Sequence, residues 1–260
     1  MRLIELISEL RDNMLRDGST LVSGDADALW NDETLARYIN NAYYRFCRLT
    51  LSLSDNSLTT ATTVSVGPPA VLSYVNKIVL ATDVDQYPLH ESILAVISGR
   101  LAGAPVDLAR TGHGVLDLPF RSDDSLYFDI NVLAALPPGK PLACATDEAD
   151  RVFRVYPTPS ADYNTQVVNL RTIRLPLEKL SLDVQTGEPE IREEWQLGML
   201  NWAAYLALSN RDVDGGDPEA ATRFKTAFAE LVDEVKQEAR RRRFAGTAWN
   251  FGRDGFSWVK

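Results

Sequence analysis

Histidine and cysteine, the side chains best suited to acid–base and nucleophilic chemistry near neutral pH, are few in this 260-residue chain. Only two histidines are present, His90 and His113, and neither is accompanied by the Gly-x-Ser-x-Gly turn that presents a hydrolase serine. The histidines and the two cysteines, Cys47 and Cys144, are too scattered for the close ligand spacing of a zinc site. We therefore interpret both histidines as surface or structural residues and predict no metal site.

Pairs of carboxylates are the one catalytic arrangement left open, because a glycosidase needs only two acidic side chains. The chain has 36 acidic residues, so their presence alone discriminates nothing. Adjacent Glu193 and Glu194 would point about 100° apart on a helix, and they fit favourable charge at a helix N-terminus. Asp123 and Asp124 fit a turn. No glycine-rich phosphate-binding loop is present, so the sequence predicts a protein that is not an enzyme and binds no cofactor.

The C-terminus combines basic and aromatic residues. From Lys236 onward the chain has seven basic and two acidic residues, so this segment carries +5 while the rest carries −14, for a net charge of −9. Such segregation predicts that the C-terminal segment meets an acidic partner surface. Arginine and aromatic side chains supply much of the binding energy at protein interfaces. The predicted docking residues are Arg240, Arg241, Arg242, Arg243, Phe244, Trp249, Phe251, Phe256 and Trp258.

Three other interpretations of this C-terminal segment stay open. The arginines also complement the dipole at the end of a helix, and a run of arginines can contact nucleic acid. The aromatic residues could fold back against the core. Glycines are interleaved with these aromatic residues, and no apolar period orders them. An arm that becomes ordered on binding is therefore at least as good an interpretation.

Helical periodicity marks both ends of the chain. Apolar residues recur at helical spacing over residues 2–16, and a second helix begins after a cap at Asn31 or Asp32 and runs to about Leu51. Its apolar stripe consists of Leu35, Tyr38, Ile39, Ala42, Tyr43 and Phe46.

Two further helices are predicted near the C-terminus. Residues 197–208 are apolar almost all round, which predicts a helix buried on most sides. Asp217 caps the next helix, with Pro218 at its first position, and this helix continues to Arg243.

The middle of the chain, residues 54–185, is rich in β-branched residues and in turns containing proline and glycine. The stretch 99–120 has no clear period, and we interpret it as a long connection. The predicted strands are 59–66, 74–81, 126–132, 152–156 and 165–174.

These segments predict an α+β protein in which N- and C-terminal helices form a helical bundle body with an inserted β-rich domain and an extended C-terminal arm. No apolar run approaches the roughly 20 residues that a membrane span needs. The N-terminus lacks the order of a signal peptide, and the two cysteines fit a reduced, soluble protein, with a single disulfide bridge as the open alternative. The predicted division is 1–53 and 186–243 for the body, 54–185 for the β-rich domain and 244–260 for the docking arm.

Several short motifs occur in a characteristic order along nearly the whole chain. They are LWNDETLARYINNA at 29–42, VYPTP at 155–159, RLPL at 174–177, PEIREEW at 189–195, LNWAAYLAL at 200–208, and RD at 211–212 followed by DPEAA at 217–221. In sequence and spacing they resemble head-to-tail adaptor proteins of tailed bacteriophages, a group that includes tail accessory factors and tubular tail protein A of short-tailed phages. One departure is Arg192, where relatives often have proline.

The resemblance implies a structural virion protein that forms a ring, of twelve copies, between portal and tail and lines the DNA channel. The implied partners are the portal protein, a downstream tail or nozzle protein, and double-stranded DNA that passes without specific binding. The β-rich insertion would face outward or toward the next tail component, and the arm would enter grooves between portal subunits. The implied location is the head–tail interface of the virion, with the host cytoplasm during assembly.

Alternatives to this interpretation remain. A different neck or tail-completion protein would have a similar construction, and a virion-associated peptidoglycan hydrolase would belong to another functional class. A DNA-binding module would show salt-sensitive affinity that depends on Arg240–Arg243.

Overall fold

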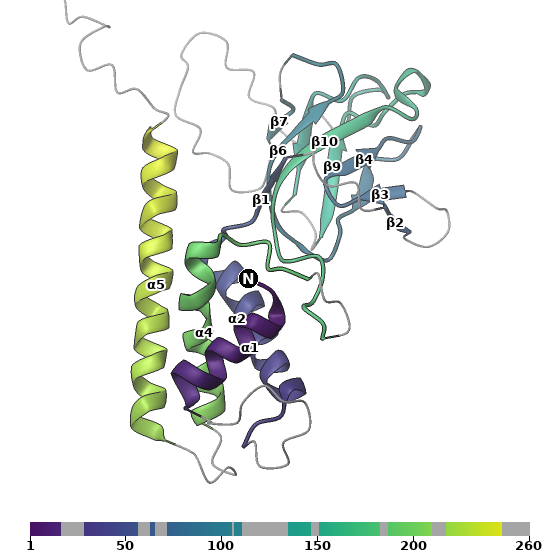
Figure 1. The fold of residues 1–260 in the computed structure, drawn as a ribbon. Helices are drawn as coiled ribbons and strands as arrows, with labels where there is room; N and C mark the ends of the chain where they lie inside the picture. The colour runs from purple at the N-terminus through teal and green to yellow at the C-terminus, as the bar shows by residue number, and fades with distance from the viewer. Residues whose placement is uncertain are drawn as a thin grey trace, which may run out of the picture. The chain divides into compact units, whose positions relative to one another are not determined.

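The protein has an α+β fold of helices and two mainly antiparallel sheets (Figure 1). It divides into a helical unit, built from Met1–Ser52 and from Glu178 onward, and a β unit, Leu53–Leu177. The division into four segments made from the sequence stays a prediction. The computed structural model describes residues 1–16, 29–56, 63–65, 72–105, 107–110, 135–146, 151–182, 187–209 and 217–245.

The N-terminal helical segment changes its geometry midway. It begins as α1 (Leu3–Glu9) and continues as a π-helical stretch, η1 (Leu10–Leu15). Arg11 lies in this stretch and is 5% exposed. Its guanidinium donates to the backbone oxygen of Trp30 at 2.8 Å and to Asp32 Oδ1 at 2.7 Å. The single helix predicted for residues 2–16 therefore has two kinds of turn, and its arginine holds the residues where the next helix begins.

The second helix, α2 (Asp32–Thr50), confirms the predicted cap, because Asn31 Oδ1 accepts a hydrogen bond from the backbone N–H of Thr34 at 2.8 Å. The helix is terminated by its C-cap residue, Leu51, whose φ of 52° places it in the left-handed region. One face is buried, and its residues are Leu35, Ala36, Ile39, Ala42, Tyr43, Phe46, Cys47 and Thr50.

The C-terminal half of the helical unit consists of α4 (Glu193–Leu208) and α5 (Pro218–Ala245). Asp217 Oδ1 accepts hydrogen bonds from the backbone N–H groups of Glu219 and Ala220, both at 3.0 Å, which confirms the predicted cap of α5. Eight residues of α4 are buried, which agrees with the predicted burial on most sides, whereas Leu197 near its start is 44% exposed.

Aromatic rings join α2, α4 and α5. Phe46 lies 6.1 Å from the ring centroid of Trp195 and 6.5 Å from that of Phe228, and Phe228 lies 5.3 Å from Trp202. Such pairs favour tilted or edge-on contacts and add about 0.5–1.5 kcal/mol each beyond their buried area. They fix α5 against the two other helices.

The β unit contains two sheets. In the six-stranded sheet, the strands follow the order β1-β10-β4-β3-β2, and β6 also pairs with β10. In the four-stranded sheet, the order is β5-β9-β8-β7. The first sheet consists of β1 (Ser54–Asn56), β2 (Thr63–Ser65), β3 (Leu72–Tyr74), β4 (Lys77–Val79), β6 (Ile93–Leu101) and β10 (Val167–Arg174). The second consists of β5 (Gln86–Pro88), β7 (Ala109–Arg110), β8 (Ala143–Ala145) and β9 (Val152–Tyr156), and a short 3-10 helix, η2 (Ala161–Tyr163), follows.

The two sheets enclose one apolar core, to which both contribute. Its buried residues are Val75, Ile78, Leu80, Tyr87, Ile93, Val96, Leu101, Cys144, Phe153, Val155, Val168 and Leu170.

The predicted strand 152–156 matches β9, and 165–174 contains β10. The connection predicted at 99–120 is wrong at two places, because β6 continues to Leu101 and β7 occupies Ala109–Arg110. The predicted strand 126–132 lies outside the described residues, as does most of 59–66.

Candidate docking interface

The predicted docking residues begin at the end of α5. Arg240 and Arg241 are exposed on its last described turns. The backbone stays helical through Arg242, Arg243 and Phe244 to Ala245, two residues beyond the predicted end of the helix. Trp249, Phe251, Phe256 and Trp258 lie outside the described residues. The structure therefore places the first part of the docking segment on a helix, and the role of all nine residues stays a prediction.

Arg192 connects the C-terminal half of α5 to the start of α4. Its Nη1 lies 3.0 Å from Glu194 Oε1 and 3.3 Å from Glu238 Oε1, and its guanidinium carbon lies 5.0 Å from the ring centroid of Trp195. These charged groups are exposed, so each ion pair contributes little to stability. These contacts nevertheless orient α5 against the start of α4. They also give Arg192 a structural role at the position where relatives often have proline.

Cations also cover aromatic rings at the other end of this helical contact. The guanidinium carbon of Arg45 lies 3.9 Å from the ring centroid of Trp202, whose Nε1 donates to Asn41 Oδ1 at 3.0 Å. The Tyr205 and Trp202 rings have centroids 4.7 Å apart and planes tilted by 44°, and Lys225 Nζ lies 5.6 Å from the Tyr205 ring centroid. The cation–π contacts hold the Arg45 side chain in one orientation at the surface.

Asn40 fastens the segment that returns from the β unit to the surface of α2. Its Oδ1 accepts from the backbone N–H of Leu180, and its Nδ2 donates to the backbone oxygen of Leu180, both at 2.8 Å. The Tyr43 hydroxyl similarly accepts from the backbone N–H of Glu190 at 2.7 Å. Side chains of α2 thus lead the chain toward the start of α4.

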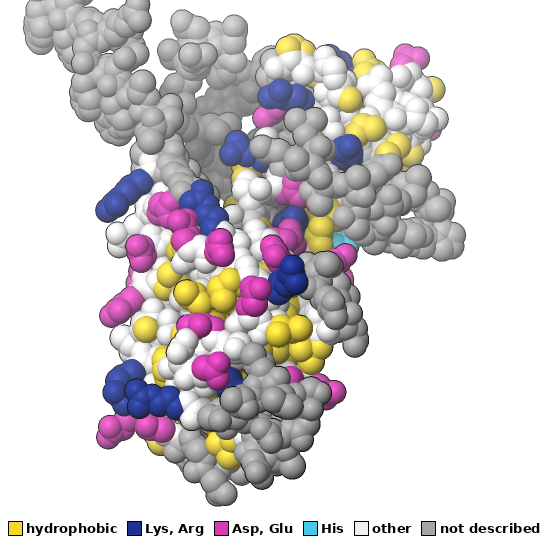
Figure 2. All heavy atoms as spheres, in the orientation of Figure 1, with side chains coloured by type: hydrophobic (Ala, Val, Ile, Leu, Met, Phe, Trp, Pro, Cys, Tyr) yellow, Lys and Arg dark blue, Asp and Glu magenta, His cyan; other side chains and the backbone are white. Residues whose placement is uncertain are grey.

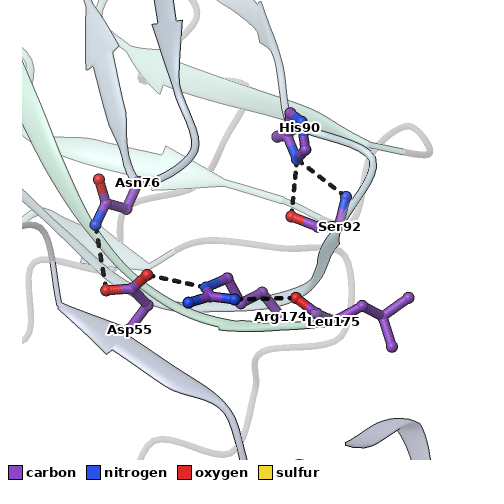
Figure 3. Close-up of polar contacts among 6 residues, drawn as sticks. All are labelled: Asp55, Asn76, His90, Ser92, Arg174 and Leu175. Atoms are coloured by element: carbon purple, nitrogen blue, oxygen red, sulfur yellow. Dashed lines mark hydrogen bonds and ion pairs between the residues drawn. The ribbon is translucent and has the colours of Figure 1, made fainter. Parts of the chain in front are cut away.

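A buried polar cluster joins the first and last strands of the β unit (Figure 3). Arg174 Nε donates to Asp55 Oδ2 at 2.9 Å, and Arg174 Nη1 donates to the backbone oxygen of Leu175 at 3.2 Å. Asn76 Nδ2 donates to the other carboxylate oxygen of Asp55 at 3.4 Å. The Asp55 and Arg174 side chains are 5% and 8% exposed. A buried ion pair of this kind fixes strand pairing, because either charge alone would be costly inside the protein.

His90 forms a local turn beside this cluster rather than a recognisable catalytic arrangement. Its Nδ1 accepts from the backbone N–H of Ser92 at 3.2 Å and lies 2.7 Å from Ser92 Oγ. Burial lowers the pKa of His90 below 6.5; the carboxylate of Glu91 opposes this shift, and the charge of Arg174 adds to it. Ser92 is 5% exposed, and a nucleophile must reach its substrate, so we interpret the pair as structural.

Of the acidic pairs considered as catalytic candidates, the structure describes only Glu193 and Glu194. Glu193 and Glu194 are exposed at the start of α4, where Glu194 pairs with Arg192. Asp123, Asp124 and His113 lie outside the described residues. Over the part of the chain that the structure describes, no group of three or more His, Cys, Asp or Glu could hold a metal ion. No helix in that part has the length and apolar character that crossing a membrane requires.

Sequence reasoning missed a basic face on α2. Arg37, Asn41 and Arg48 are exposed, and Arg45 is partly exposed between them. Positions 37, 41, 45 and 48 fall on one side of a helix, opposite the buried stripe. The signal was present in the sequence, because α2 contains no acidic residue after Glu33. We call these four residues the α2 basic face.

An acidic face lies on α5. Glu230, Asp233 and Glu234 are exposed on its middle turns, and we call them the α5 acidic face. Figure 2 shows acidic side chains along this helix, with basic side chains near both of its ends. Opposite charges are therefore presented by two helices of the same unit.

Comparison with protein families gives one match that covers nearly all of the chain. The family described as SU10 adaptor protein matches residues 1–250. No curated protein matches the chain. The matched region contains all of the helices and strands described above and reaches into the segment that follows α5.

Proposed function

This chain belongs to the SU10 adaptor protein family of phage head-to-tail adaptors, and from that premise we propose that it forms a ring between the portal and the tail of the virion. The family match carries the proposal. The ring would contain twelve copies and would surround the channel through which double-stranded DNA passes. Portal protein would bind on one side of the ring and a tail or nozzle protein on the other, after assembly in the host cytoplasm.

The organisation of the helical unit supports such a role. Its helices are fixed by buried aromatic contacts and by Asn40, so the unit can act as a rigid body. The long helix α5 presents exposed Arg240 and Arg241 near its C-terminal end, and it would hold the start of the docking arm at a fixed place. The chain's net charge of −9 would also keep channel walls from binding phosphates tightly.

The ring is tested by measuring particle mass and imaging negatively stained particles of this protein, alone and mixed with its portal protein. A ring that forms on the portal, or grows with it, is the expected result. A chain that stays monomeric and separate from portal rings would refute the adaptor role and would direct work to cell-wall and DNA-binding assays.

The docking arm, predicted as residues 244–260, is tested by deleting residues 246–260, because this shorter deletion leaves α5 intact. The shortened chain should keep its helix content and melting temperature and lose binding to portal rings. A matched variant, Lys140→Glu in the β unit, changes an exposed charge elsewhere and should bind like the parent chain. Undiminished binding by the shortened chain would show that the arm is not the anchor.

A further inference from the structure

Within the part of the chain that the structure describes, the charged faces of α2 and α5 form no ion pairs, although the guanidinium carbon of Arg37 lies 5.7 Å from the Tyr38 ring centroid and that of Arg45 lies 3.9 Å from the Trp202 ring centroid. Ion pairs among the described residues involve none of the three arginines of the α2 basic face and none of the three acids of the α5 acidic face. Both faces belong to the helical unit, so one folded chain presents both at once. Their charges are therefore available to another molecule.

We propose that the α2 basic face of one copy binds the α5 acidic face of the next copy, an inference that rests on the proposed ring. The partner is a second copy of this chain because the chain itself carries the complementary surface. Contact between two different faces is head-to-tail, and each added copy leaves one face of each kind open. Such a contact closes into a ring when the rotation between copies divides a full turn.

The charged side chains of the two faces have similar spacings along their helices, so they can pair where the α2 helix of one copy crosses the α5 helix of the next. At 1.5 Å per residue, Arg45 and Arg48 are about 4.5 Å apart along α2, and Glu230 and Glu234 are about 6 Å apart along α5. The stacking of Arg45 on Trp202 orders one of these cations in advance, which reduces the entropy lost on binding. Exposed charges of this kind set orientation and partner choice more than total affinity.

Nucleic acid is the competing partner for arginines on a helix. The α2 basic face holds three arginines in a chain of net charge −9, whereas tight non-specific DNA binding uses many phosphate contacts. The nearby acidic face on the same unit would repel a duplex that covered both. We therefore favour protein–protein contact and treat DNA binding as an outcome of the test.

The test uses two charge-reversed variants of the full chain. Arg37→Glu with Arg48→Glu makes both faces acidic, and Glu230→Lys with Glu234→Lys makes both faces basic. Arg45 and Glu238 are kept because they contact Trp202 and Arg192. Lys140→Glu with Lys179→Glu is the control, since both lysines are exposed and lie outside the two faces.

Each reversed variant should raise the concentration needed for ring formation on the portal by about 10- to 100-fold, and the control should change it less than about twofold. A 1:1 mixture of the two variants should restore ring formation, because every contact then joins an acidic face to a basic one. Melting temperatures within a few degrees of the parent would show that the variants fold. Neutral versions, Arg37→Gln with Arg48→Gln, should weaken assembly less.

Two results would overturn the inference. One is ring formation by both variants at the parent concentration, and the other is a mixture that assembles no better than its components. If the arginine variant no longer binds duplex DNA but forms rings like the parent chain, the α2 basic face is assigned to nucleic acid instead. Failure of the parent chain to form any ring would refute the proposed function itself, and it would do so before either variant is measured.

Discussion

The helical unit and the β unit hold their distant segments together with different chemistry. In the helical unit, the ring of Phe46 contacts Trp195 and Phe228, and the neutral side chain of Asn40 bonds the returning backbone. In the β unit, the buried charges of Asp55 and Arg174 join the first strand to the last. Truncating an apolar core residue costs stability in proportion to the apolar volume removed. Removing one charge of a buried ion pair instead leaves the other charge buried without a counter-ion. The two units should therefore respond differently to single substitutions.

Removing one core ring from each unit gives the largest expected effects. Phe46→Ala and Phe153→Ala each replace a ring that is 0% exposed, and each should cost about 3–5 kcal/mol of stability in its own unit. Hydrogen exchange measured by mass spectrometry should rise in α2, α4 and α5 for the first variant and in β6, β9 and β10 for the second. Equal loss of protection in both units from either variant would show that they unfold as one.

Separating the buried ion pair sharpens the comparison. Asp55→Asn leaves the charge of Arg174 buried without its counter-ion and should lower the free energy of unfolding by about 3–5 kcal/mol. Urea denaturation measures this loss. Pairing Asp55→Leu with Arg174→Met removes both charges and should recover most of it, and a double variant less stable than Asp55→Asn would contradict this account.

Asn40→Ala should have an intermediate effect. It removes both hydrogen bonds to the backbone of Leu180 and should cost about 1–3 kcal/mol, because the peptide group loses its partners in a partly buried place. Asn41→Ala is a matched control that removes one bond to Trp202 and should cost less. Thermal melts of both variants compare them directly. A larger loss for Asn41→Ala would show that Asn40 does not hold the returning segment.

The smallest expected effect is a pH dependence in the β unit. Because the pKa of His90 is lowered in the folded protein, the unfolded chain takes up a proton near pH 6.5 while the folded chain stays neutral. Stability should therefore fall as pH drops from above 6.5 through the lowered pKa. His90→Asn should flatten this part of the curve of unfolding free energy against pH. An unchanged slope would assign the dependence to other groups.

The helices could be predicted from the sequence because their caps and their buried faces follow local rules. Asn31 and Asp217 accept backbone hydrogen bonds within their own first turns, and the buried face of α2 repeats at the helical period. The π-helical turn at Leu10–Leu15 was not readable, since Arg11 is turned inward by contacts to residues about twenty positions away.

Strands were harder to predict where tertiary pairing interrupts their period. In β6, the partners of β10 skip Ile97 and Leu94, so the alternation of buried and exposed residues breaks twice. Strands β1 and β5 have three residues each, too few for any period to appear. The candidate site divides in the same way. Charge along α2 and α5 could be read from helical spacing, whereas the Asp55–Arg174 pair joins positions 119 residues apart.

The backbone N–H of Arg174 bonds to the oxygen of Leu53 at 3.0 Å, so the two ends of the β unit meet at neighbouring peptide groups. Domains whose ends are adjacent can be inserted into a host chain, or removed from it, without rethreading the host. The size or surface of the β unit can therefore change while the helices keep their own connections.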